Sequence, residues 1–148
     1  MQNQGRIVAT DIKSDRLNRV EQNAQRLQLE IIEPQLIRPE LDDLPTDLFD
    51  AVLVDTPCSN TGVLGKRPEA RWRMEEKELR ELSTLQQQLL HAACERVRPE
   101  GRVVYSTCSI EPEENHDVVK AVLAERPHRP ERRRVGEECS SRCWPYPQ

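Results

Sequence analysis

The sequence has 148 residues, enough for one domain with a hydrophobic core and too few to suggest two. Its formal net charge of −4 excludes a basic field over the whole surface, so any nucleic-acid contact must be local. No apolar run approaches the roughly 20 residues of a membrane-spanning helix, and no secretory signal is recognisable. The five cysteines are an odd number, which argues against a disulfide framework. We expect a cytoplasmic protein with reduced thiols.

The amino-terminal part of the chain predicts a strand, a helix and a second, short strand. Residues 7–9 form an apolar strand that runs into the carboxylate of Asp11. Apolar residues then recur every three or four positions over residues 13–29, a spacing that predicts an amphipathic helix. Prolines interrupt residues 31–48 and leave room only for a short strand near residues 35–37.

The central part of the chain continues this alternation. Residues 51–54 form a continuous apolar run, typical of a parallel strand buried on both faces, and the run ends in the carboxylate of Asp55. A long amphipathic helix is predicted over residues 75–97, and the proline and glycine of residues 99–101 are expected to close it. Another apolar strand follows at residues 103–105.

Pro112 is expected to begin a final helix, because proline is favoured at the first helical position. Residues 127–148 have four prolines, an arginine run and no apolar period, so we expect a disordered or poorly packed tail. Strands that alternate with helices predict an α/β fold with a mainly parallel sheet, in which ligands bind beyond the carboxyl ends of the strands. Asp11, Asp55 and Cys108 all lie at such ends.

Two polar segments each place a cysteine just after a predicted strand: Cys58 within residues 55–63 and Cys108 within residues 105–115. A structural cysteine normally sits in an apolar stretch, as Cys94 does on its predicted helix. These two instead lie where α/β enzymes place reactive groups. One such cysteine would more often be structural, whereas two together favour a functional site.

The first segment reads Asp-x-Pro-Cys-Ser-x-Thr-Gly-Val, and the second reads Tyr-Ser-Thr-Cys-Ser-x-x-Pro-Glu-Glu-Asn. Both resemble, nearly residue for residue, the signature of the RNA cytosine-5 methyltransferases of the RsmB/NOP (Sun) type. The resemblance also includes residues 65–72 and, more weakly, residues 9–11. It implies that residues 1–125 are the C-terminal part of a catalytic domain that uses S-adenosylmethionine, and it leaves residues 126–148 as a divergent tail.

The resemblance assigns roles to three side chains. Carbon 5 of cytosine is too weak a nucleophile to attack a methyl sulfonium, so such enzymes first add a thiolate to carbon 6. By resemblance Cys108 is this nucleophile, Asp55 hydrogen-bonds the base near N3, and Cys58 acts in the release step. Because a free thiol is mostly protonated at neutral pH, we expect the site to favour the thiolate of Cys108. The target cytosine must be unstacked, which favours a loop or single-stranded RNA.

Asp11 matches the family's acidic residue that binds the ribose hydroxyls of the cofactor, and Asp55 is expected to contact the cofactor as well. Without the two cysteine motifs, an acid in the place of Asp11 would more often be a helix cap. The family's acid near the adenine has no assigned counterpart in residues 36–43.

A local cluster of cations is the best candidate for contact with RNA. Lys66, Arg67 and Arg71 flank Trp72, a combination that suits phosphates and a stacked base. An ordinary solvated loop explains the same residues equally well. The substrate that the resemblance implies is RNA, with ribosomal RNA favoured.

The family places a strand and a glycine-rich cofactor loop ahead of the segment that is present here, whereas this chain has only Gly5 before Gly62. The resemblance therefore implies an incomplete Rossmann-like sheet. The missing first strand would lie between the strands that end at Asp11 and Asp55. Its absence should split the sheet and expose strand edges, unless those strands rearrange to pair with each other.

Two other functions compete with methyl transfer. The missing loop also fits a catalytically inactive remnant or an RNA-binding module. A cysteine hydrolase would need a histidine base, but His116 has no orienting partner in the sequence nearby. His91, His116 and His128 have no metal-ligand spacing with any cysteine, so no metal site is expected.

Overall fold

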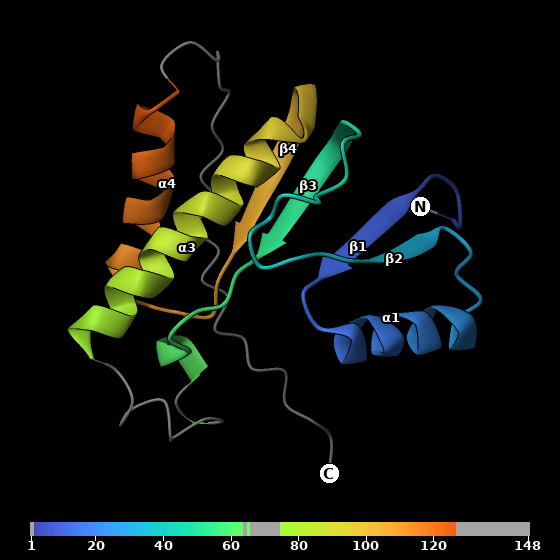
Figure 1. The fold of residues 1–148 in the computed structure, drawn as a ribbon, viewed down its shortest axis with the longest axis horizontal. Coiled ribbons are helices and arrows are strands. Elements are labelled where there is room, and N and C mark those ends of the chain that lie inside the picture. Colours follow the sequence, from blue (N-terminus) through green and yellow to red (C-terminus); the bar gives the residue numbers. More distant parts are fainter. Residues whose placement is uncertain (1, 64, 66–74, 127–148) are drawn as a thin grey trace.

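The computed structural model describes residues 2–63, 65 and 75–126 (Figure 1). Strands and helices alternate along these residues, which confirms the α/β class. The elements in chain order are β1 (Ile7–Asp11), α1 (Ser14–Arg26), β2 (Ile32–Leu36), β3 (Phe49–Asp55), the 3-10 turn η1 (Thr61–Val63), α3 (Glu76–Glu95), β4 (Val97–Ser106), the 3-10 turn η2 (Pro112–Glu114) and α4 (His116–Ala124). None of the helices in this part of the chain is long and apolar enough to cross a membrane.

The strands form two separate parallel pairs rather than one sheet. β1 pairs with β2, with Ile7 opposite Ile32, and β3 pairs with β4, with Asp55 opposite Ser106. Figure 1 shows β1, α1 and β2 on one side, and the β3–β4 pair with α3 and α4 on the other. This division agrees with the split, incomplete Rossmann-like sheet that the resemblance implies, and β1 and β3 do not rearrange to pair with each other.

Each pair of strands is covered by its own helices. α1 contacts β1 and β2, and it buries Leu17 and Ala24. Over the second pair, Leu90 of α3 and Val118 and Val122 of α4 form a core cluster. Partly buried residues pack around this cluster: Cys94, Val103, Tyr105 and Val119. The apolar face of each amphipathic helix therefore packs against one face of its own strand pair.

The expectation that β3 is buried on both faces is wrong. Val54 is 9% exposed, but its neighbour Leu53 is 69% exposed, and Val104 of β4 is 47% exposed. Successive side chains of a strand point to opposite faces. The helices cover only the face that carries Val54, so the opposite face of the β3–β4 pair is left uncovered among the described residues.

Three element boundaries differ from the sequence-based expectations. β4 begins at Val97, so residues 99–101 lie inside a strand rather than in a helix-closing turn. The pairing of β3 with β4 accommodates them by a shift in register between Phe49 and Ala51. β2 begins at Ile32 and includes Pro34, which an edge strand tolerates because its outer N–H groups need no partner.

Pro112 begins the turn η2 rather than α4. The backbone breaks at Asn115, with φ −117° and ψ −97°, and the helix α4 starts only after it. This break gives Glu114 a position between the Cys108 loop and α4.

Candidate active site

The site lies where β3 and β4 end side by side. Asp55 is opposite Ser106 in the register, and Thr56 continues the pairing because both its backbone N–H and its hydroxyl donate to the Ser106 carbonyl, at 3.1 and 3.2 Å. Parallel strands place their carboxyl ends at the same edge of a sheet. The loops that carry Cys58 and Cys108 therefore leave the sheet next to each other.

The structure brings the two thiols into direct contact. Cys58 Sγ lies 2.7 Å from Cys108 Sγ, well beyond the roughly 2.05 Å of a disulfide bond. The Cys108 thiol also donates to Asn60 Oδ1 at 3.1 Å, while Asn60 Nδ2 donates to the Cys58 carbonyl at 2.9 Å. Asn60 has a φ of 63°, a left-handed conformation that asparagine tolerates well. Cys108 is exposed and Cys58 is partly exposed, so a substrate can reach the pair.

Gly62 allows the two loops to approach closely. Its N–H donates to the Cys108 carbonyl at 3.0 Å, and a Cβ at this position would lie 2.7 Å from the same oxygen. Any residue other than glycine would push the Cys108 backbone away.

A cluster of hydroxyls joins the two loops below the thiols. Ser109 Oγ lies 3.1 Å from the hydroxyl of Ser59 and 3.1 Å from that of Thr61. Thr61 Oγ1 in turn accepts the N–H of Ile110 at 3.1 Å. The Cys58 and Cys108 loops are thus held together as one unit.

The thiol of Cys108 is protonated at neutral pH, contrary to the expectation that the site favours the thiolate. Its pKa is raised from the ordinary 9.0 to about 11, and partial burial is the largest cause, although the residue as a whole is exposed. The hydrogen bond with Cys58, the charge of Cys58 and the charge of Asp55 contribute to the same rise, in that order of size. Cys58 and the carboxylate of Asp55 therefore both oppose a negative charge on the Cys108 sulfur.

Asp55 is exposed and lies close enough to Cys108 for its charge to act on the thiol. Among the described residues no hydrogen bond or ion pair occupies its side-chain carboxylate. The carboxylate is therefore available to accept hydrogen bonds from a ligand beside the two thiols.

Asp11 is not brought to the thiols by any contact among the described residues. Its side chain is 22% exposed, Oδ1 accepts the N–H of Lys13 at 2.8 Å, and Oδ2 lies 3.3 Å from Arg16. These contacts are those of a residue that stabilises the start of α1. Its role at the cofactor stays a prediction.

The cationic candidates Lys66, Arg67 and Arg71, with Trp72, lie outside the described residues, as does the tail from residue 127. Their expected contact with RNA stays a prediction, and so does the domain boundary near residue 125.

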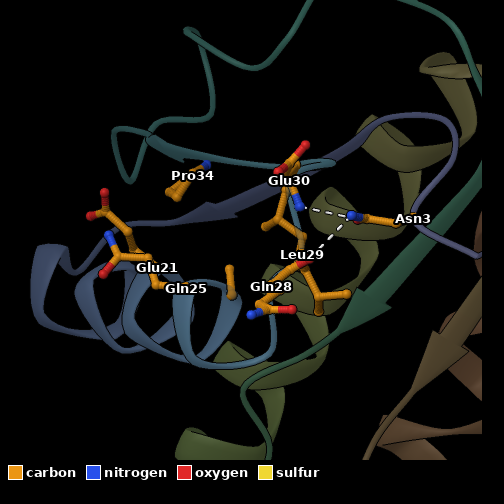
Figure 2. Close-up of a pocket in the computed structure, with 9 residues that line it drawn as sticks. Asn3, Glu21, Gln25, Gln28, Leu29, Glu30 and Pro34 are labelled. Atoms are coloured by element: carbon orange, nitrogen blue, oxygen red, sulfur yellow. Dashed lines mark hydrogen bonds between the residues drawn. The ribbon is translucent and has the colours of Figure 1, made fainter.

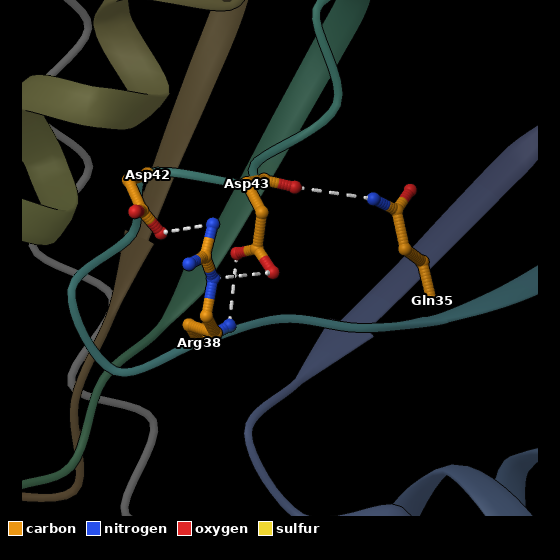
Figure 3. A network of polar contacts seen from close by, with 4 residues as sticks. All are labelled: Gln35, Arg38, Asp42 and Asp43. Carbon is orange, nitrogen blue, oxygen red and sulfur yellow. Dashed lines mark hydrogen bonds and ion pairs between the residues drawn. The ribbon is translucent and has the colours of Figure 1, made fainter.

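In residues 36–43, the segment that corresponds to the family's adenine contact, the charged side chains pair with one another. Figure 3 shows Arg38 between two acids: its guanidinium lies 3.0 Å from Asp42 and 3.4 Å from Asp43. Gln35 donates to the Asp43 carbonyl at 3.2 Å, and the backbone N–H of Arg38 donates to the Asp43 side chain at 2.8 Å. The pKa of Asp43 is lowered, chiefly by this backbone hydrogen bond.

A surface hollow lies between α1 and β2 and includes Asn3, Gln28 and Glu30 (Figure 2). None of the predicted site residues lines it. In the described part of the chain no three His, Cys, Asp or Glu residues are grouped as metal ligands. His91 instead pairs with Glu125 at 2.7 Å.

Sequence reasoning missed Asn60, Gln86 and Glu114. Gln86 carried a readable signal, since it is a polar residue within the apolar stripe of α3, one turn from Leu82 and one turn from Leu90. Both Gln86 and Glu114 are fully buried beneath the Cys58 loop.

The chain matches the family model of 16S rRNA methyltransferase RsmB/F over residues 1–143. It is 38% identical over 126 residues to the ribosomal RNA small subunit methyltransferase B of Klebsiella pneumoniae (strain 342), which covers 84% of this chain and 29% of that relative. The chain thus spans less than a third of that relative's length.

Two solved structures from Pyrococcus horikoshii are similar in fold. NSun6 with SFG has a TM-score of 0.73 and 31% identity over 84% of this chain and 32% of that one. A methyltransferase homolog protein has a TM-score of 0.71 and 31% identity over 84% of this chain and 38% of that one. Because the family model matches residues 1–143 of the 148 residues, the chain belongs to the RsmB/F family of 16S rRNA methyltransferases.

Proposed function

We propose that this chain carries the base-facing part of an RNA cytosine-5 methyltransferase that acts on ribosomal RNA through a covalent cysteine–cytosine intermediate. The observation that supports this most strongly is the contact of 2.7 Å between the sulfurs of Cys58 and Cys108, beside the open carboxylate of Asp55. Carbon-5 methylation needs a thiol to activate the base and a second group to help release it. Ribosomal RNA as substrate would place the activity in the cytoplasm of a bacterium.

In the proposed reaction Cys108 attacks carbon 6 of an unstacked cytosine. Addition of the Cys108 sulfur to carbon 6 moves an electron pair toward N3, so the proton that leaves the Cys108 thiol is balanced by a proton gained at N3. Asp55 is assigned to the N3 edge of the base, where it would hold a proton as electron density moves through the ring. Cys58 is then assigned to the last step: as a thiolate it takes the proton on carbon 5, the C–H electron pair re-forms the C5–C6 double bond, and Cys108 leaves carbon 6 as a thiolate while N3 gives up its proton.

S-adenosylmethionine, the cofactor of this family, supplies the methyl group when bound, and the related NSun6 structure holds SFG, an analogue of it. Asp11 and Asp55 fit this cofactor chemically, because carboxylates at strand ends accept hydrogen bonds from hydroxyl and amino groups. Because the chain spans 29% of its curated relative, we assign turnover to a longer protein that contains this segment.

The competing proposal is an RNA-binding module without catalysis. A chimera separates the two: residues 1–125 replace the matching stretch of the Klebsiella pneumoniae relative, and an RNA with 5-fluorocytosine is offered together with the cofactor. A covalent adduct that Cys108→Ser abolishes and Cys94→Ser retains would support methyl transfer. A chimera that binds RNA and cofactor but forms no adduct would refute it.

A further inference from the structure

Two buried polar side chains lie directly under the Cys58 loop. Gln86 of α3 and Glu114 of η2 are both 0% exposed, although their neighbours Leu90 and Val118 belong to the apolar core. Polar groups of this kind are costly to bury unless each is hydrogen-bonded. Their contacts therefore show what holds them in place.

The contacts of both side chains converge on the backbone on either side of Cys58. Gln86 Nε2 donates to the Pro57 carbonyl at 2.9 Å and to Glu114 Oε1 at 2.9 Å. Glu114 Oε1 also accepts the Ser59 N–H at 2.9 Å, and Oε2 accepts the Ser59 hydroxyl. The residues before and after Cys58 are thus each fixed by a side chain from another element.

The orientation of the Gln86 amide follows from its partners. If the amide were turned over, its oxygen would face the Pro57 carbonyl and the Glu114 carboxylate, which are both acceptors. In the observed orientation both amide hydrogens are used, while the buried Gln86 Oε1 has no hydrogen-bond partner among the described residues. An unsatisfied buried acceptor is destabilising, so packing alone does not explain a glutamine in this position.

Glu114 belongs to the same stretch of backbone as Cys108, and that stretch is itself held firmly. The Tyr105 hydroxyl donates to the Glu114 carbonyl at 2.7 Å. The Asn115 side-chain amide donates to the carbonyls of Ser109 and Glu111, at 2.9 and 2.8 Å. Glu114 therefore grips the Cys58 loop from a backbone that is fixed relative to Cys108.

We propose that Gln86 and Glu114 are positioning residues that set the separation of the Cys58 and Cys108 thiols by clamping the residues on either side of Cys58. Their importance for catalysis rests on the proposed function, because only a two-thiol mechanism needs this separation. The clamp itself is a property of this chain, whatever reaction it performs. It adds two residues to the site that touch neither base nor cofactor.

The clamp can be measured on the full 148-residue chain by thiol–disulfide exchange. Oxidised glutathione takes up the two electrons and two protons of the Cys58–Cys108 pair, yielding the protein disulfide and two molecules of reduced glutathione. The equilibrium constant is the effective concentration of one thiol at the other. Differential alkylation with peptide mapping assigns the disulfide to these two cysteines.

Glu114→Gln replaces the carboxylate that accepts from Ser59 and Gln86 with an amide, whose NH2 group cannot accept. Gln86→Met keeps the side-chain length but removes the hydrogen bonds to the Pro57 carbonyl and to Glu114. We expect each change to lower the effective concentration by about tenfold or more, the effect of losing hydrogen bonds to a charged group. The matched control is Glu113→Gln, an exposed neighbour whose side chain has no hydrogen bond or ion pair with the described residues of the Cys58 loop, and it should leave the value unchanged.

The clamp is overturned if Glu114→Gln and Gln86→Met leave the exchange equilibrium at the value of the unsubstituted chain, even where thermal unfolding shows that they destabilise the fold. If either variant does not fold, Ser59→Ala provides the test, since it keeps the Ser59 N–H bond to Glu114 and removes the hydroxyl bond to Glu114 together with the hydroxyl contacts to Ser109 and Thr61, and it should lower the effective concentration by about threefold. An unchanged value for Ser59→Ala would then count against the clamp. A chimera that forms no adduct with RNA would refute the proposed function and leave this result standing.

Discussion

Replacing Cys58 with alanine should lower the pKa of Cys108 and make its thiol more reactive. A rise of the pKa from the ordinary 9.0 to about 11 leaves Cys108 with roughly a hundredfold less thiolate at neutral pH than an ordinary cysteine has. Cys58 accounts for part of this rise, through its hydrogen bond and its charge. Burial is the largest cause and is retained in the variant, so the pKa should fall but stay above 9.0.

The assay is the rate of alkylation of Cys108 by iodoacetamide as a function of pH, read by peptide mapping so that other thiols do not interfere. For the unsubstituted chain the rate should rise with a midpoint near 11, and for Cys58→Ala the midpoint should be lower. Cys94→Ser, a change on α3 two turns along the helix from Gln86, is the control and should leave the midpoint unchanged. A midpoint of 9.0 or below in the unsubstituted chain would contradict a raised pKa for Cys108.

Asp55→Asn should also lower the pKa of Cys108, but by less than Cys58→Ala because its charge is the smallest of the named causes, and the same alkylation profile tests the order. Since the pKa of Cys108 is raised in the folded state, its contribution to stability should be present below pH 9 and be lost between pH 9 and about 11, as denaturant unfolding at several pH values would show. Gly62→Ala should displace the Cys108 carbonyl and lower the Cys58–Cys108 exchange equilibrium, and an unchanged equilibrium would contradict the close approach. Val118→Ala should destabilise the fold by about 2 kcal/mol, measured by urea unfolding, because the side chain is 0% exposed in the core cluster.

Much of the fold could be predicted because it depends on local patterns. The apolar periods identified β1, α1, β3 and α3, whose side chains pack against neighbours in the way that spacing alone implies. The meeting of Cys58 and Cys108 could be anticipated too, since both follow strands of a parallel sheet and such strands end at one edge.

The rest depended on contacts that spacing does not reveal. The exposure of Leu53 follows from which neighbours cover β3, and a continuous apolar run reads the same whether one face is covered or two. Proline and glycine normally close a helix, so the sequence predicts a turn at residues 99–101, yet a register shift accommodates these residues in β4.

The chemistry of the site was also only partly readable. The raised pKa of Cys108 arises from burial and from two neighbours, and a motif states neither. Gln86 and Glu114 reach the Cys58 loop across 29 and 55 residues of sequence, so their part in the site follows from the placement of α3 and η2 under this loop and not from any local pattern.

The central claim is that Cys108 attacks the base and Cys58 releases it. The most direct measurement uses the chimera that carries Cys58→Ala, incubated with unmodified ribosomal RNA and S-adenosylmethionine. The amount of covalent protein–RNA adduct is measured, and mass spectrometry identifies the peptide that is attached to the RNA. We expect a methylated cytosine to accumulate on the peptide that contains Cys108, and little adduct to remain in the parent chimera. Adduct on another residue, or full turnover without Cys58, would contradict it.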